Sequence, residues 1–128
     1  MKIAAIVARI LLGATFLFFG LNDILGFITM PPMPGQAGEF AGLLIATKYM
    51  AFVGVLMVIS GLLLLVGRFV PLALTILAPI LVNILLFHFL IAHGGAAMGL
   101  VATALELFLM SVYRKSFYTL FHPAPEVF

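Results

Sequence analysis

Few side chains in this sequence of 128 residues could do chemistry, and most of them lie within or beside long apolar segments. The segment from Arg68 to His93, RFVPLALTILAPILVNILLFHFLIAH, holds Pro79, Asn83 and His88. In a bilayer these residues are costly, because proline frees a backbone carbonyl and an amide needs hydrogen-bond partners. Since Asn83 lies one helical turn after Pro79, the functional interpretation is a polar notch that bonds a lipid head group or a quinone carbonyl. The structural alternative is a packing bond to another helix, worth ~0.6 kcal/mol.

A second set of polar residues lies near the ends of the apolar segments. We expect them to meet at one membrane surface as a candidate ligand-binding site, which comprises Asn22, Asp23, Glu39, Asn83, His88 and His93. The expected ligand is a quinone or a lipid, and no residue is expected to be catalytic. The alternative is that these side chains only line the interface, where polar groups cost little. No metal or haem site is expected, because residues five apart, such as His88 and His93, point about 140° apart on a helix.

Two charges lie inside apolar segments. Arg9 lies about six residues into the first segment, and Glu106 lies seven residues before Tyr113 in the last. With a rise of about 1.5 Å per residue, the two share a depth if their segments run in opposite directions. Because a buried charge needs a partner, we predict a structural ion pair between Arg9 and Glu106. The alternative is that Arg9 extends to the interface while Glu106 is protonated or faces another subunit.

The composition indicates a membrane protein. Hydrophobic residues make up 66% of the chain and charged residues 8%, whereas soluble domains have about 45–50% and about 25%. The absence of cysteine excludes thiol nucleophiles, thiolate metal sites and disulfides. The net charge of +2, with its Lys and Arg mostly near segment ends, indicates membrane topology and not nucleic-acid binding. We expect one domain, residues 1–128, that retains its first segment, because Arg9 interrupts it and no cleavage signal follows near Gly20.

The hydropathy pattern predicts an all-α membrane protein, a bundle of four transmembrane helices. The spans are expected at residues 3–21, 48–66, 71–91 and 96–113, each near the ~20 residues that cross a bilayer. After the first span, PPMPG cannot be regular helix, and AGEFAGLLIAT predicts a short interfacial helix in the first external loop. Small residues seven apart predict packing faces on three spans, at Gly13 and Gly20, Gly54 and Gly61, and Ala97 and Ala104.

The basic residues predict the orientation of the spans. If both termini are cytoplasmic, five of the six Lys and Arg lie inside, namely Lys2, Arg9, Arg68, Arg114 and Lys115. Only Lys48 then faces outward, which is a strong positive-inside signal. We therefore expect a multi-pass protein whose candidate ligand-binding site opens toward the outer leaflet.

Four segments together resemble the DoxX family of small four-span bacterial membrane proteins. In chain order they are ARILLGATFLFFGLND, PPMPG with GEF after it, GRFVPLALTILAPILVNILLFHFL and LELFLMSVYRKSF, and they cover most of the chain. VNILLFH is the most specific of them, whereas the first is generic on its own. The resemblance implies a four-helix bundle in the bacterial cytoplasmic membrane. It also implies that five positions of this chain match residues of the family pattern: Asn22, Glu39, Asn83, His88 and Glu106.

The second span departs from the family pattern. Many relatives have a Lys and a Glu three residues apart there, in a VKVLEV-like run, whereas this chain has VGVLMV with Gly54 and Met57. If that pair serves proton or quinone chemistry in the family, this chain lacks it.

Two functions follow from the resemblance. Family names come from a thiosulfate:quinone oxidoreductase subunit and a membrane-bound oxidoreductase complex, and related four-helix proteins act as receptor chaperones or cargo receptors. We favour a non-enzymatic accessory or assembly subunit of a larger membrane complex, because the chain carries no flavin, haem or thiol chemistry of its own. The alternative is a quinone-binding subunit of an oxidoreductase system. A small exporter is less expected, since such proteins rely on an acid in the first helix, where this chain has Arg9 instead. Expected partners are membrane lipids and either a larger complex or further copies of the chain.

Overall fold

The computed structural model describes residues 2–28 and 33–127, and every regular element in these two ranges is helical. In chain order the elements are α1 (Lys2–Leu25), α2 (Gly35–Ala46), α3 (Tyr49–Val66), α4 (Val70–Leu86), the π-helix η1 (Phe87–Ile91), α5 (Ala97–Val112), the single turn α6 (Arg114–Phe117) and the 3-10 turn η2 (Tyr118–Phe121). The prediction of an all-α chain is confirmed over these residues. The long helices begin and end close to the predicted boundaries, and α1 runs on to Leu25.

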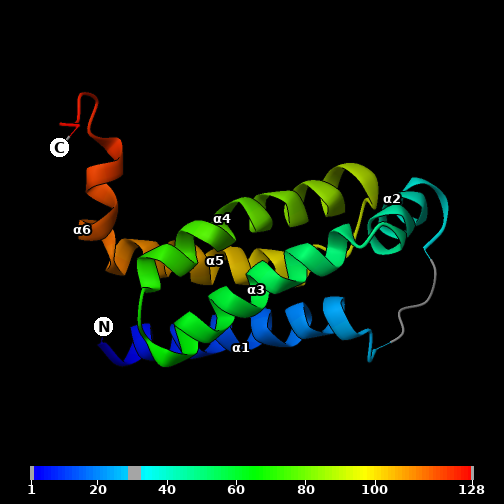
Figure 1. Cartoon of the computed structure of the whole chain (residues 1–128), viewed down its shortest axis with the longest axis horizontal. Coiled ribbons are helices and arrows are strands. Elements are labelled where there is room, and N and C mark those ends of the chain that lie inside the picture. Colours follow the sequence, from blue (N-terminus) through cyan, green and yellow to red (C-terminus); the bar gives the residue numbers. More distant parts are fainter. Residues whose placement is uncertain (1, 29–32, 128) are drawn as a thin grey trace.

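The long helices α1, α3, α4 and α5 lie side by side along the length of the molecule (Figure 1). α1 packs against α3 and α5, and α4 packs against the same two helices. Five fully buried leucines, contributed by all four helices, form the centre of the core: Leu12, Leu64, Leu74, Leu77 and Leu109. Between helices in lipid such contacts stabilise mainly through close packing.

Glycines set the close contact between α1 and α3. A Cβ atom at Gly61 would lie 2.7 Å from the carbonyl oxygen of Gly13, and one at Gly54 would lie 2.7 Å from that of Gly20. The predicted small-residue faces of the first two spans are therefore confirmed. The predicted face on α5 is wrong, because Ala97 and Ala104 are exposed. The small residue through which α5 packs on α4 is instead Gly99, which faces Ile84 and Leu85.

Three helical stretches are long and apolar enough to cross a membrane: Lys2–Leu25, Tyr49–Val66 and the continuous α4 and η1, Val70–Ile91. The fourth long helix, α5, has 16 residues and meets the same criterion only together with α6 and η2, which turn away from it by 84°. A helix of this length rises about 24 Å, which is less than the ~30 Å hydrocarbon core of a bilayer. The chain thus has three segments, or four if the bent pair counts as one, that are long and apolar enough to cross a membrane.

The two ends of the long helices differ in character. At one end α2 lies across the helices and contacts α3 and η1, and we call it the α2 end (Figure 1). Helix α2 confirms the short helix predicted after PPMPG. Pro31 and Pro32 of that motif lie outside the described residues, whereas Pro34 is extended, with ψ of 157°, directly before the helix. At the opposite end lie the start of α1, the link between α3 and α4, and the bend into α6. We call this the basic end, because it carries Lys2, Arg68, Arg114 and Lys115.

Candidate functional site

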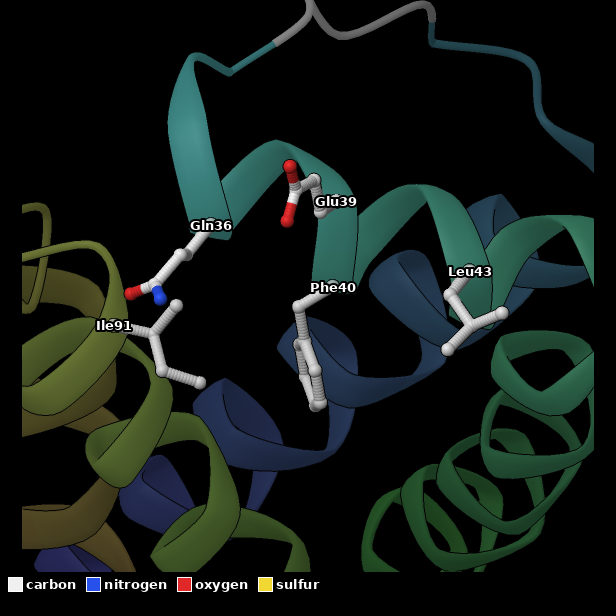
Figure 2. A pocket seen from close by; sticks show the side chains of 5 residues that line it. All are labelled: Gln36, Glu39, Phe40, Leu43 and Ile91. Carbon is white, nitrogen blue, oxygen red and sulfur yellow. The ribbon is translucent and has the colours of Figure 1, made fainter.

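A pocket of about 440 Å³ lies between α2 and η1 at the α2 end. Gln36, Glu39, Phe40 and Leu43 line it from α2, and Ile91 lines it from η1. The four α2 residues follow the spacing i, i+3, i+4 and i+7, so they share one face of this 12-residue helix. Figure 2 shows Phe40 pointing from α2 down toward the long helices, with Glu39 above it and Ile91 beside Gln36. The pocket is therefore a cleft between the short helix and the end of the third predicted span.

A change of helix type at the end of α4 forms one wall of this region. In η1 the backbone N–H of Ala92 donates to the carbonyl of Phe87, five residues back, at 2.8 Å. The ring of Phe87 stacks on Phe40 of α2, with centroids 5.7 Å apart and an angle of 26° between the rings. This aromatic pair joins α2 to η1. A π-helical turn is rare and is often found at functional sites, so its position beside the pocket favours a binding role.

The two histidines of the candidate site are both near η1, and neither lines the pocket. His88 is half-buried, and its Nδ1 lies 2.7 Å from the carbonyl oxygen of Ile84. Because a carbonyl only accepts, Nδ1 carries a proton in this contact. His93 is exposed and has a left-handed backbone, with φ of 56°. His88 contributes to the region through its edge-on contact with Phe87, at 5.2 Å between centroids.

Asn22 and Asp23 belong to a different part of the α2 end. The side-chain oxygen of Asn22 accepts a hydrogen bond from the backbone N–H of Ile28 at 2.8 Å, and so it orders the turn that follows α1. Asp23 lies against α3, where a Cβ atom at Gly54 would be 2.9 Å from its own Cβ. Of the six candidate residues, Glu39 is the one that lines the pocket. The structure therefore does not bring the set together around this cavity.

Asn83 lies on the exposed face of α4 and not in a packing contact. Its Nδ2 donates to the carbonyl oxygen of Pro79 in the same helix at 2.8 Å. Thr75, one turn before Pro79, donates likewise to Pro71 at 2.8 Å, and all three residues Thr75, Pro79 and Asn83 are exposed. The predicted interhelical bond is thus replaced by a bond within α4. Thr75, Pro79 and Asn83 form an outward-facing stripe, and its role as a ligand-binding notch stays a prediction.

Arg9 and Glu106, the two charges expected within the spans, are not hydrogen-bonded to each other. Both carboxylate oxygens of Glu106 are buried without a hydrogen-bond partner, and so is Nε of Arg9. The Arg9 guanidinium instead lies against Gly67 at the end of α3, where a Cβ atom would be 2.8 Å from Nη1. The ion pair stays a prediction that this arrangement does not support.

Sequence reasoning missed three residues of interest. Gln36 and Phe40 line the pocket, and the helical spacing in GQAGEFAGLL was the signal that could have found them. Ser60 is fully buried, and its hydroxyl has no hydrogen-bond partner. It was recognisable as a lone hydroxyl within VGVLMVISGLLLLV.

The α2 pocket has the chemistry of a weakly polar binding cleft. Glu39 and Gln36 offer hydrogen-bond acceptors and donors at one side, and Phe40 offers an aromatic wall. In the described residues no group of three or more His, Asp or Glu is placed to hold a metal ion. The cleft suits a flat or amphiphilic molecule better than a metal ion.

Comparison with family models, with curated proteins and with solved structures finds no match for this chain.

Proposed function

We propose that this chain is a DoxX-like, four-span protein of the bacterial cytoplasmic membrane, with both termini in the cytoplasm. Its function is that of a non-enzymatic accessory or assembly subunit of a larger membrane complex. The resemblance of the four sequence segments, the three or four apolar helices and the uneven distribution of basic residues support the membrane assignment.

The observation that carries the accessory role is the outward-facing Asn83. Its bond to Pro79 uses one amide N–H and leaves the second N–H and the side-chain oxygen without a partner within α4. An amide on an exposed helix face is unfavourable against lipid tails but favourable against a polar group of another helix. Val82 and Leu86, beside Asn83, are exposed and complete an apolar surface for such a helix. We therefore infer that the α4 face docks onto a partner membrane protein.

Site-specific photo-crosslinking in native membranes tests this role. A photoreactive residue at Val82 or Leu86 is expected to form one major crosslink to a larger membrane protein, and the Asn83→Leu variant is expected to weaken it. The same residue at Leu107, an exposed position on α5, is the matched control and should give no such product. Removing the chain should also lower the amount of the assembled partner. Crosslinks only to a second copy, or equal products from Val82 and Leu107, would contradict an accessory role.

A quinone-binding role is the second candidate, and the α2 pocket favours it. The Phe40–Phe87 stack beside Glu39 and Gln36 provides an aromatic wall next to polar groups, as a quinone head requires. Purification in mild detergent followed by extraction is expected to recover stoichiometric quinone from the wild type and much less from Phe40→Ala. The Ile45→Ala variant, exposed on the same helix, is the control. A wild-type protein free of quinone would exclude this role.

A further inference from the structure

A second cavity, of about 650 Å³, lies at the basic end, far from the α2 pocket. It opens between the first turns of α1 and the end of α5, and its lining comprises Lys2, Ala5, Ile6, Arg9, Val112, Tyr113 and Arg114. Among these residues three carry a positive charge, one carries a phenol and none is acidic. The lining thus combines strong positive charge with apolar walls.

The basic side chains of this cavity have free hydrogen-bond donors. Arg9 lines the cavity and is half-buried. Its Nε is buried without a hydrogen-bond partner, so its terminal N–H groups are the ones that can face a ligand. Arg114 uses Nη1 to donate to the carbonyl of Ser111 at 3.1 Å, which leaves its other N–H groups available. Guanidinium groups match the geometry of phosphate oxygens and bind them through paired hydrogen bonds. The cavity is therefore complementary to a phosphate group.

The apolar part of the cavity indicates that the phosphate belongs to a lipid. Ile6 in the lining is followed along the same face of α1 by Ile10 and preceded by Ile3, and all three are exposed. This strip covers the first turns of the 24-residue helix α1, and Ile10 continues it past Arg9 toward the middle of the helix. A soluble anion would use the charges but not the strip, whereas a phospholipid uses both.

We propose that the basic-end cavity binds the head group of an anionic phospholipid, with an acyl chain along Ile6 and Ile10. The chain bends by 84° after α5, and Arg114 is the first residue of the helix that follows the bend. Tyr118 and Phe121 are exposed on this bent segment. Aromatic side chains of this kind favour the head-group region of a bilayer. A zwitterionic lipid fits less well, because its ammonium group opposes three cations.

Native mass spectrometry of the full chain in non-ionic detergent provides the test. Phosphatidylglycerol and phosphatidylcholine with identical acyl chains are added at equal concentration, and the bound fraction is measured for each. The wild type is expected to retain phosphatidylglycerol preferentially. Each cation removed should lower the affinity about fivefold, so the Arg9→Gln/Arg114→Gln double variant should lose about 25-fold in affinity for phosphatidylglycerol. Lys115→Gln removes a neighbouring exposed charge outside the lining and is the matched control.

Three outcomes of the mass-spectrometry measurement would overturn the proposal. They are equal retention of both lipids by the wild type, unchanged phosphatidylglycerol binding in the double variant, and an equal loss in Lys115→Gln. Inorganic phosphate or glycerol phosphate is added in a parallel thermal unfolding series. If either reproduces the full stabilisation given by phosphatidylglycerol, the site takes a free phosphate and not a lipid. If the double variant fails to fold, the single variants Lys2→Gln and Arg114→Gln, both at exposed positions, are compared with the wild type instead. Each should lose about fivefold in affinity for phosphatidylglycerol.

Discussion

At the scale of single residues, Glu106 has the most unusual environment. It is 3% exposed, and neither carboxylate oxygen has a hydrogen-bond partner. A buried polar group without a partner costs about 1–3 kcal/mol. We therefore expect Glu106→Leu to raise the free energy of unfolding in detergent by about that amount, measured by equilibrium denaturation. Glu106→Gln retains a buried polar group and should change the stability little.

The same pair of variants decides the question of the ion pair. If Arg9 and Glu106 form a buried salt bridge, Glu106→Leu leaves an unpaired charge and should destabilise the protein by about 3–5 kcal/mol. A loss of that size would show that the arrangement with Arg9 against Gly67 is not the dominant one.

The contact between α1 and α3 depends on the absence of a side chain at Gly61. A Cβ atom there would lie 2.7 Å from both the Gly13 carbonyl oxygen and the backbone nitrogen of Leu17. Because neither backbone atom can move without shifting a helix, Gly61→Ala should destabilise by about 1–3 kcal/mol. Gly42→Ala, in α2 with open space around it, should instead be neutral or stabilising by about 0.5–1 kcal/mol. Thermal unfolding of the two variants checks this, and equal effects would argue against the close contact.

At the scale of elements, the attachment of α2 is the most testable feature. Ala37 is its one buried residue within the described part, and the helix contacts α3 and η1, with the Phe40–Phe87 stack joining it to η1. An aromatic pair contributes about 0.5–1.5 kcal/mol beyond the area that it buries. Phe40→Ala should therefore open α2 and raise hydrogen exchange over residues 35–46 by about tenfold, measured by mass spectrometry.

The control for this experiment is Ile45→Ala, which truncates a side chain that is 66% exposed on the same helix. Exchange in α2 should stay as in the wild type. A comparable increase in both variants would show that helix propensity, and not the aromatic stack, determines the order of α2.

The elements also show how much the sequence could predict. Long apolar runs bounded by Gly67, Arg68 or PPMPG predicted the helices closely, because hydrophobicity and helix-breaking residues are local signals. The π-helix η1 and the bend after α5 were not predicted. The candidate site was predicted from depth in the membrane alone. Depth does not give the direction of a side chain around its helix, which is why Asn83 turned outward and Asp23 faced Gly54.

At the scale of the whole molecule, the distribution of charge predicts the orientation in the membrane. Arg9, Lys2 and Arg114 gather around one cavity at the basic end, and Arg68 lies in the link between α3 and α4. Lys48, between α2 and α3, is the one basic residue at the α2 end. Since the basic side of a multi-pass protein stays in the cytoplasm, we expect α2 to face outward.

Cysteine labelling tests this orientation directly, because the chain has no cysteine of its own. Thr47→Cys at the α2 end and Ser116→Cys at the basic end are both exposed, whereas Leu77→Cys is fully buried and should never react. With a membrane-impermeant maleimide, Thr47→Cys should label in intact cells and Ser116→Cys only after permeabilisation. The reverse pattern would invert the orientation. Labelling of both positions in intact cells would show that the 16-residue α5 does not cross the bilayer, since three crossings leave the C-terminal segment on the same side as α2.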